Sequence, residues 1–228
     1  LFITSRGSNS IQRINIGQDR NASFTNSDVE NLGNIGGILS GPEDIVFVFD
    51  NSTWYGIVAN YSNNQLVLLD FGDSLAALEE NISATTITIP AGVSLSSPSD
   101  LELEKIDNKY YLFIGNRGGA KVNRFIFDQT ITADPDVANI SIPGSSSPRS
   151  TSLIKDCDNW YLYVADEAFD KIYQLDFSSD LSSTPIITTI AASGDLLDNP
   201  FRIQLFRENG VFYGLVTTRQ NLIKLEFG

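Results

Sequence analysis

The sequence predicts an all-β protein, a β-propeller of four-stranded antiparallel blades, with about five blades in this chain and the first and last of them incomplete. One observation behind this prediction is a unit of about 50 residues that recurs along the chain, a period typical of propeller blades. A second is that its apolar runs have the length of strands, are rich in β-branched and aromatic residues, and are bounded by turn formers. A third is that these runs are apolar on both faces, as expected of a blade packed between two neighbours.

The clearest copy of the unit spans residues 41–72. It contains three apolar runs, at residues 45–49, 54–59 and 66–71. Asp50-Asn51 separates the first two runs, and a polar turn rich in asparagine separates the second from the third. Short polar turns between strand-length apolar runs predict a three-stranded antiparallel meander.

Two markers recur at fixed places in the unit. A proline opens the first strand, at Pro42, Pro98, Pro148 and Pro200. An aromatic pair opens the second strand: Trp54-Tyr55, Tyr110-Tyr111, Trp160-Tyr161 and Phe212-Tyr213. Because adjacent residues of a strand point to opposite faces, we expect these pairs to fill the core on both sides of a blade and not to form a sugar-binding platform.

The markers divide the chain into repeat units, which we expect to form a single β-propeller domain or part of one. The units cover about residues 1–40, 41–97, 98–147, 148–199 and 200–228. An outermost fourth strand is clearest at residues 86–89 and 185–190. Residues 1–17 match the second and third strands of the unit, and the last strand is a third strand. Either five slightly incomplete blades close on themselves, or residues outside this chain supply more blades. We expect the second, with the chain as a piece of a longer polypeptide and about six to eight blades in the whole propeller.

Composition excludes several classes of function. The net charge of −13 argues against a nucleic-acid partner and against binding to an anionic membrane, and no membrane insertion is predicted. The chain has no histidine and a single cysteine, so Ser-His and Cys-His pairs, histidine zinc ligands and thiolate metal sites are excluded. That cysteine, Cys157, stands at the end of a predicted strand, where we expect a small buried hydrophobic residue. No cofactor is predicted.

The full repeat signature is a proline, an apolar strand, an Asp-Asn turn, an aromatic pair, a second apolar strand, an asparagine-rich turn and the sequence LDFGDSL of residues 69–75. Together with residues 31–37 and 54–60, it resembles the NHL-like propeller repeats of secreted multidomain surface proteins of Bacteroidota, of the type IX secretion or gliding-motility type. The later units depart from it, because Asp128 and Ser178 replace the glycine. The resemblance implies export, display at the cell surface and a scaffold or adhesion role.

Carboxylates remain as catalytic groups, because glycoside hydrolysis needs only a pair of them. Four stand at the starts of the predicted innermost strands: Glu43, Asp44, Asp100 and Glu102. Turn capping and solvation at strand starts account for the same residues. Two pairs of acidic residues suggest calcium, Asp134/Asp136 and Asp156/Asp158, but neither has the alternating ligands of a calcium loop, and no metal site is predicted.

One rim of loops is the predicted ligand site. In a propeller, the turns that follow the second strands lie on the same face as the starts of the innermost strands. The residues predicted to bind a ligand there are Arg6, Asp44, Tyr61, Asp100, Arg117, Arg149, Glu167, Arg202 and Arg219, with Phe169 among the same turns. Arginine beside aromatic residues suits recognition of a carboxylate, a sugar or a protein, although hairpin tips are polar for simple reasons of solvation as well.

The sequence therefore predicts a non-catalytic binding or scaffold module of an exported cell-surface protein, which recognises a protein or a glycan through this rim. The alternative is a propeller hydrolase that acts on glycans or lactones through axial carboxylates or calcium. The two differ in whether carboxylates converge on the axis with at least one raised pKa. An intracellular propeller that binds other proteins is a third alternative.

Overall fold

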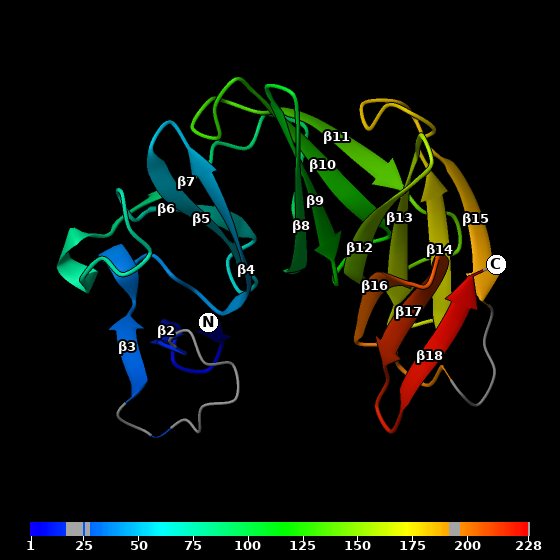
Figure 1. Ribbon diagram of the computed structural model, residues 1–228, viewed down its shortest axis with the longest axis horizontal. Helices are drawn as coiled ribbons and strands as arrows, with labels where there is room; N and C mark the ends of the chain where they lie inside the picture. The colour runs from blue at the N-terminus through cyan, green and yellow to red at the C-terminus, as the bar shows by residue number, and fades with distance from the viewer. Residues whose placement is uncertain (17–24, 26–27, 192–196, 228) are drawn as a thin grey trace. The chain divides into compact units, whose positions relative to one another are not determined.

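A computed structural model describes residues 1–16, 25, 28–191 and 197–227, and strands dominate these residues (Figure 1). The chain forms two compact units, Leu1–Thr88 and Ile89–Gly228. The short helices η2 (Ile35–Gly37) and η3 (Glu79–Asn81) are single 3-10 turns. No helix in the described part of the chain is long and apolar enough to cross a membrane.

The first unit contains a three-stranded and a four-stranded antiparallel sheet, each with its strands in chain order. The strands of the first sheet are β1 (Phe2–Ser5), β2 (Ser10–Ile14) and β3 (Val29–Gly33). Those of the second sheet are β4 (Pro42–Asp50), β5 (Thr53–Asn60), β6 (Gln65–Asp70) and β7 (Ser83–Thr86). Each sheet is therefore a simple meander.

The second unit contains two four-stranded sheets and a three-stranded one, again as antiparallel meanders. The first sheet comprises β8 (Pro98–Ile106), β9 (Lys109–Asn116), β10 (Lys121–Asp128) and β11 (Asp136–Ser141). The next comprises β12 (Pro148–Asp156), β13 (Asn159–Asp166), β14 (Lys171–Asp176) and β15 (Ile186–Ala191). The last comprises β16 (Arg202–Glu208), β17 (Val211–Thr217) and β18 (Leu222–Phe227). These sheets have the strand number and order of the predicted blades, with incomplete blades at both ends of the sequence.

The first strands of neighbouring sheets are adjacent within the second unit: β12 contacts both β8 and β16. The second strand of one sheet also contacts the first strand of the next, as β9 does with β12 and β13 with β16. In the first unit, β1 has the same relation to β4. β1 therefore corresponds to a second strand, as the repeat predicted.

The hairpin turns explain why the strands reverse where they do. Between β4 and β5, both Asn51 and Ser52 have positive φ, of 48° and 65°, the backbone needed for a tight two-residue turn. Asp107 and Asn209 take the same left-handed conformation in later turns. So does Cys157, with φ of 52°, and its side chain is exposed. The prediction of a buried cysteine was wrong, because this residue belongs to the turn and not to the strand.

The cores lie between neighbouring sheets of a unit. In the second unit, Phe113 and Val122 of one sheet pack with Trp160, Leu162 and Phe177 of the next. The rings of Phe113 and Phe177 lie with their centroids 5.3 Å apart. Burial of such rings is the main stabilising contribution, at about 1.5–3 kcal/mol for each large apolar side chain. β9 is buried at every position after its first residue, as expected of a strand inside a blade.

A similar core lies in the first unit, where residues of β2, β5 and β6 pack around the ring of Phe71. The aromatic pairs follow the prediction only in part. Tyr110, Tyr111 and Trp160 are buried. The members of the pairs that open β5 and β17, and Tyr161, are half-buried. The expected fourth strand at residues 86–89 ends earlier, as β7 at Ser83–Thr86, whereas β15 agrees with the expectation for residues 185–190.

Candidate functional site

In the four-stranded sheets, the first strand begins with a β-bulge. The pairing with the second strand shifts between Pro42 and Asp44, between Pro98 and Asp100, and between Pro148 and Ser150. The bulged residues are Glu43, Ser99 and Arg149. Proline suits this place because it has no N–H to offer the ladder. A bulge re-aims side chains, so these starts present polar groups outside the regular ladder.

Side chains of one first strand cap the backbone of the next in the second unit. Asp100 Oδ2 accepts a hydrogen bond of 2.6 Å from the N–H of Thr151, and Glu102 Oε1 accepts one of 3.3 Å from Leu153. Two serines of β12 accept from β16 in the same manner, Ser150 Oγ from Ile203 and Ser152 Oγ from Leu205. These contacts satisfy N–H groups that the edge of a first strand would otherwise leave unpaired.

Asp100 is the most enclosed carboxylate among the predicted rim residues, with 4% of its surface exposed. Besides the bond from the Thr151 N–H, its Oδ2 accepts from the hydroxyls of Thr151 at 3.1 Å and Ser150 at 3.3 Å. Its Oδ1 lies 3.7 Å from Nη2 of Arg202, a side chain that is 57% exposed. Asp100 is therefore fixed in position at the start of β8, with an exposed cation beside it.

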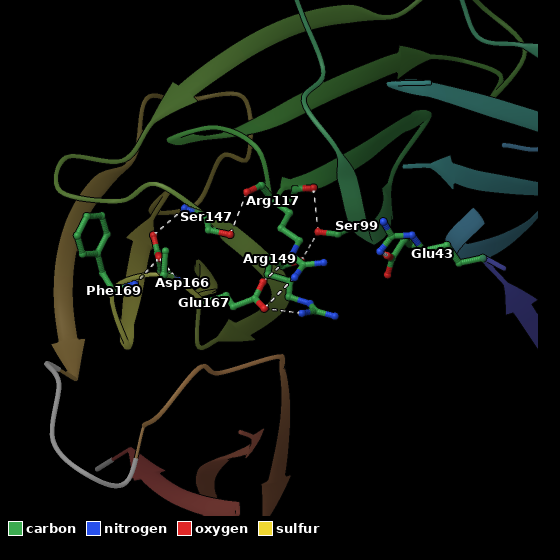
Figure 2. Close-up of polar contacts among 11 residues, drawn as sticks. Glu43, Ser99, Arg117, Ser147, Arg149, Asp166, Glu167 and Phe169 are labelled. Atoms are coloured by element: carbon green, nitrogen blue, oxygen red, sulfur yellow. Dashed lines mark hydrogen bonds and ion pairs between the residues drawn. The ribbon is translucent and has the colours of Figure 1, made fainter. Parts of the chain in front are cut away.

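Next to this pair, Arg117, Arg149 and Glu167 form what we call the arginine cluster, and Figure 2 shows both guanidinium groups pointing toward the carboxylate. Arg117 binds Glu167 through two nitrogens, at 2.6 Å and 3.0 Å. Arg149 donates from Nη1 to Glu167 Oε1 at 2.9 Å. The Arg149 guanidinium also lies 4.5 Å from the centroid of the Phe201 ring, a cation–π contact.

The backbone around the arginine cluster is held by short polar contacts. Ser99 donates from Oγ to the carbonyl of Arg149 at 2.7 Å, and Ser147 donates to the carbonyl of Arg117 at 2.9 Å (Figure 2). Gly115 allows the close approach of β9 to this bulge. A Cβ at that position would lie 2.9 Å from the carbonyl oxygen of Arg149.

Asp166 fixes the turn that carries Glu167 and is fully buried. Its Oδ2 accepts from the N–H groups of Ser146 at 2.9 Å and Ser147 at 3.3 Å, and from the hydroxyl of Ser145. Its Oδ1 accepts from the N–H groups of Ala168 and Phe169, both at 3.0 Å (Figure 2). All five partners are donors, so this carboxylate is a structural residue of the rim.

This buried polar position was not predicted from the sequence, although a signal was present. A polar residue ends the second strand in three units, as Asn60, Asn116 and Asp166, and each is fully buried. Asn60 and Asn116 each accept a hydrogen bond from the backbone that leads into the first strand, at Ser40 and Ser96. A polar residue that recurs at the end of an apolar strand indicates such a hydrogen bond to the backbone.

The predicted rim residues are distributed over both units. Arg117, Arg149 and Glu167 lie together, with Asp100 and Arg202 as a second pair in the same unit. In the first unit, Arg6 binds Glu43 at 2.8 Å and lies 3.8 Å from the centre of the Tyr61 ring. The remaining three residues of the prediction differ in exposure: Phe169 and Arg219 are exposed, and Asp44 is half-buried.

The predicted catalytic carboxylates divide in the same way. Glu43 and Asp44 belong to the first unit. Asp100 and Glu102 lie two residues apart on one face of β8, a spacing of about 6.6 Å along a strand. That value is the distance between the two backbone positions, and the carboxyl groups of inverting glycosidases lie about 6.5–9.5 Å apart. Further along β8, burial raises the pKa of Glu104, and the charge of Lys155 opposes this shift.

Neither pair suggested for calcium gains a third acidic ligand. Among residues 1–16, 25, 28–191 and 197–227, no group of three or more histidine, cysteine or acidic side chains is placed to hold a metal ion. Asp156 instead lies 3.8 Å from Nη2 of Arg207. It borders a cavity of about 270 Å³ between the last two sheets, which is lined by aromatic and polar side chains: Ile154, Asp156, Tyr161, Tyr163, Gln174, Asp176, Phe212 and Phe227.

Comparison with known proteins supports the fold. No protein-family model and no curated protein matches the sequence. A thermostable family-43 glycoside hydrolase has a similar structure, with 13% identity and a TM-score of 0.56 over 88% of this chain and 79% of that one. An enzyme of family GH43 from Xanthomonas citri, solved with xylotriose, matches with 11% identity and a TM-score of 0.51 over 82% and 70%.

An exo-β-1,3-galactanase from Phanerochaete chrysosporium, solved with β-1,3-galactotriose, matches with 14% identity and a TM-score of 0.52 over 92% of this chain. The chain spans 48% of the length of that enzyme. These similarities confirm the predicted all-β propeller fold. The structures that share it are enzymes, which contradicts the prediction of a non-catalytic module and favours the alternative of a propeller hydrolase.

The error has a chemical cause. The missing histidine and the single cysteine exclude nucleophilic and zinc-dependent sites, but hydrolysis of a glycosidic bond needs no such group. Two carboxylates in a suitable position are sufficient, and acidic residues at strand starts were interpreted as caps. Asp100 and Glu102 do cap the edge of β12, and that role does not remove their carboxylates from chemistry.

Proposed function

We propose that this chain belongs to a glycan-active β-propeller, a glycoside hydrolase whose site lies at the starts of β8, β12 and β16. The observation that carries the proposal is Asp100, an enclosed carboxylate placed by a bulge at the start of a first strand. Similarity of the fold to glycoside hydrolases solved with galactotriose and xylotriose supports it.

The roles of the side chains follow from their positions. Asp100 and Glu102 supply two carboxylates at a spacing suited to an attacking water between the general base and the sugar ring. Asp100 is held by donors on Ser150 and Thr151, so it can act without reorganisation. The arginine cluster fixes the loops that surround these carboxylates. On this basis we expect hydrolysis with inversion at the anomeric carbon.

The proposal is tested with a panel of p-nitrophenyl glycosides of the common pentoses and hexoses and with matching oligosaccharides. We expect release of p-nitrophenol from at least one glycoside by the wild-type chain, and a loss of at least about 100-fold in kcat for Asp100→Asn and Glu102→Gln. Asparagine and glutamine keep an acceptor oxygen for the caps on β12, so the melting temperature should change little.

Asp107→Asn is the matched control, because Asp107 is an exposed turn residue at the other end of β8. Hydrolysis that persists in both acid variants would contradict the assignment of the site. Absence of hydrolysis and of glycan binding across the whole panel would contradict the proposed function.

Export to the cell surface is a separate proposal. Its support is the resemblance of the repeat signature to surface proteins of Bacteroidota, and the acidic net charge of −13 is compatible with it. Cleavage of the protein on intact cells by an added protease is the expected result. Full protection in intact cells with cleavage after lysis would overturn this proposal.

A further inference from the structure

Three guanidinium groups gather around the start of β8 and the turn that carries Glu167. Arg117 and Arg149 share the carboxylate of Glu167, and Arg202 is the partner of Asp100. Arginine side chains present planar sets of N–H donors, which suit the binding of an anion such as a carboxylate.

Two of the arginines are placed to receive that anion. Arg149 gives one nitrogen to Glu167 and lies against the ring of Phe201, which fixes the direction of its guanidinium. Arg202 follows Phe201 in sequence, and its contact with Asp100 is long, at 3.7 Å. Its side chain is 57% exposed. A guanidinium has five N–H donors in a planar fork, so each group retains donors for a second carboxylate.

We infer that Arg149 and Arg202 form a subsite for the carboxylate of a uronic acid unit in the glycan. This inference rests on the proposed function, which makes a glycan the ligand. A planar carboxylate matches the guanidinium fork better than a hydroxyl group does. The C5 carboxylate of a uronic acid lies on the same ring as the anomeric carbon, so a ring held by these arginines would present its glycosidic bond near Asp100.

A neutral glycan offers these guanidinium groups only hydroxyl acceptors. An acidic glycan makes charge-assisted hydrogen bonds with them, which are roughly twice as strong as neutral ones. The subsite therefore selects acidic over neutral glycans, and this preference weakens as salt screens the exposed Arg202.

The test is calorimetric titration of the Asp100→Asn protein, which keeps the arginines and does not consume the ligand. The probes are trigalacturonate, a xylotriose carrying one glucuronic acid, and unsubstituted xylotriose. We expect at least one acidic probe to bind about tenfold or more tightly than xylotriose at low salt, and this ratio to fall at high salt. Equal affinities for all three probes would overturn the inference while leaving the proposed function intact.

Variants locate the subsite. Arg202→Gln, added to Asp100→Asn, should weaken the acidic probe about tenfold and leave xylotriose unchanged. Arg207→Gln is the matched control, because Arg207 lies on the same strand, is 54% exposed and makes an equally long contact of 3.8 Å with Asp156. Arg149→Gln should act as Arg202→Gln does. Equal losses for Arg202→Gln and Arg207→Gln would overturn the assignment.

The outcomes for the two proposals are distinguishable. Binding of an acidic probe without any hydrolysis by the wild-type chain would support the subsite and contradict the catalytic part of the proposed function. Binding and hydrolysis of neutral glycans alone would support the proposed function and contradict the subsite. Absence of binding by every probe, together with absence of hydrolysis, would contradict both.

Discussion

Asp166→Asn replaces one carboxylate oxygen by an NH₂ group in the buried hydrogen-bond network that holds the turn carrying Glu167. The carboxylate accepts only from donors, two on Oδ1 and three on Oδ2. An asparagine keeps one oxygen and turns an NH₂ group toward at least two of these donors. Loss of two hydrogen bonds to a charged group corresponds to about 3–6 kcal/mol. Removing a buried charge offsets part of this loss, so we expect about 2–4 kcal/mol of destabilisation.

Asn116 occupies the same place one repeat earlier and provides the reciprocal change. Its Nδ2 donates to the carbonyls of Ile114 and Lys121 and to Oδ1 of Asn123, so in Asn116→Asp an acceptor would face three acceptors. Each variant should lower the melting temperature by about 4–16 °C in thermal unfolding followed by circular dichroism. Asp107→Asn, in an exposed turn, should shift it by less than about 2 °C. If Asp166→Asn or Asn116→Asp lowers the melting temperature no more than Asp107→Asn does, the stabilising role of these hydrogen bonds is wrong.

Three further predictions concern packing and pH. Arg124 is 8% exposed and donates from Nη1 to the carbonyls of Leu181 and Ser183, both at 2.6 Å. Arg124→Ala should therefore lower the free energy of unfolding in urea by about 2–4 kcal/mol, and an unchanged midpoint would refute this role. Gly115→Ala should cost about 1–3 kcal/mol through its clash with the Arg149 carbonyl, against almost none for Gly7→Ala, whose Cβ meets open space. Burial raises the pKa of Glu104 above 4.5, so the folded state keeps the proton of this carboxyl up to a higher pH than the unfolded state does. The stability that this difference contributes is therefore lost as the pH rises from 4.5 through the folded-state pKa. Glu104→Gln should remove this part of the pH dependence; identical slopes in both proteins would contradict it.

The blades were predictable because their signals are local. A proline, a two-residue turn and an aromatic pair each fix a strand boundary within a few residues, and the repeat then supplies the rest. A strand without such local signals is misplaced, as β7 was. Its four residues, from Ser83 to Thr86, are almost all polar, whereas the apolar residues that follow lie outside the strand.

Contacts between blades were not predictable from local signals. Arg117 meets Glu167 across 50 residues, and Asp100 meets Thr151 across 51, which is one repeat period in each case. Residues at corresponding positions of consecutive units therefore face one another, and the sequence alone did not reveal which of them pair. This is why the rim residues were identified but their grouping into the arginine cluster and the Asp100–Arg202 pair was not.

In the proposed function, a glycan binds at the start of β8, beside Asp100. A crystal structure of the Asp100→Asn protein soaked with glucuronic acid-substituted xylotriose tests it directly. We expect sugar density next to residue 100 and Glu102, with a carboxylate on Arg149 or Arg202. Density confined to the cavity lined by Tyr161, Tyr163 and Phe212, or no bound sugar at concentrations that saturate binding in solution, would contradict it.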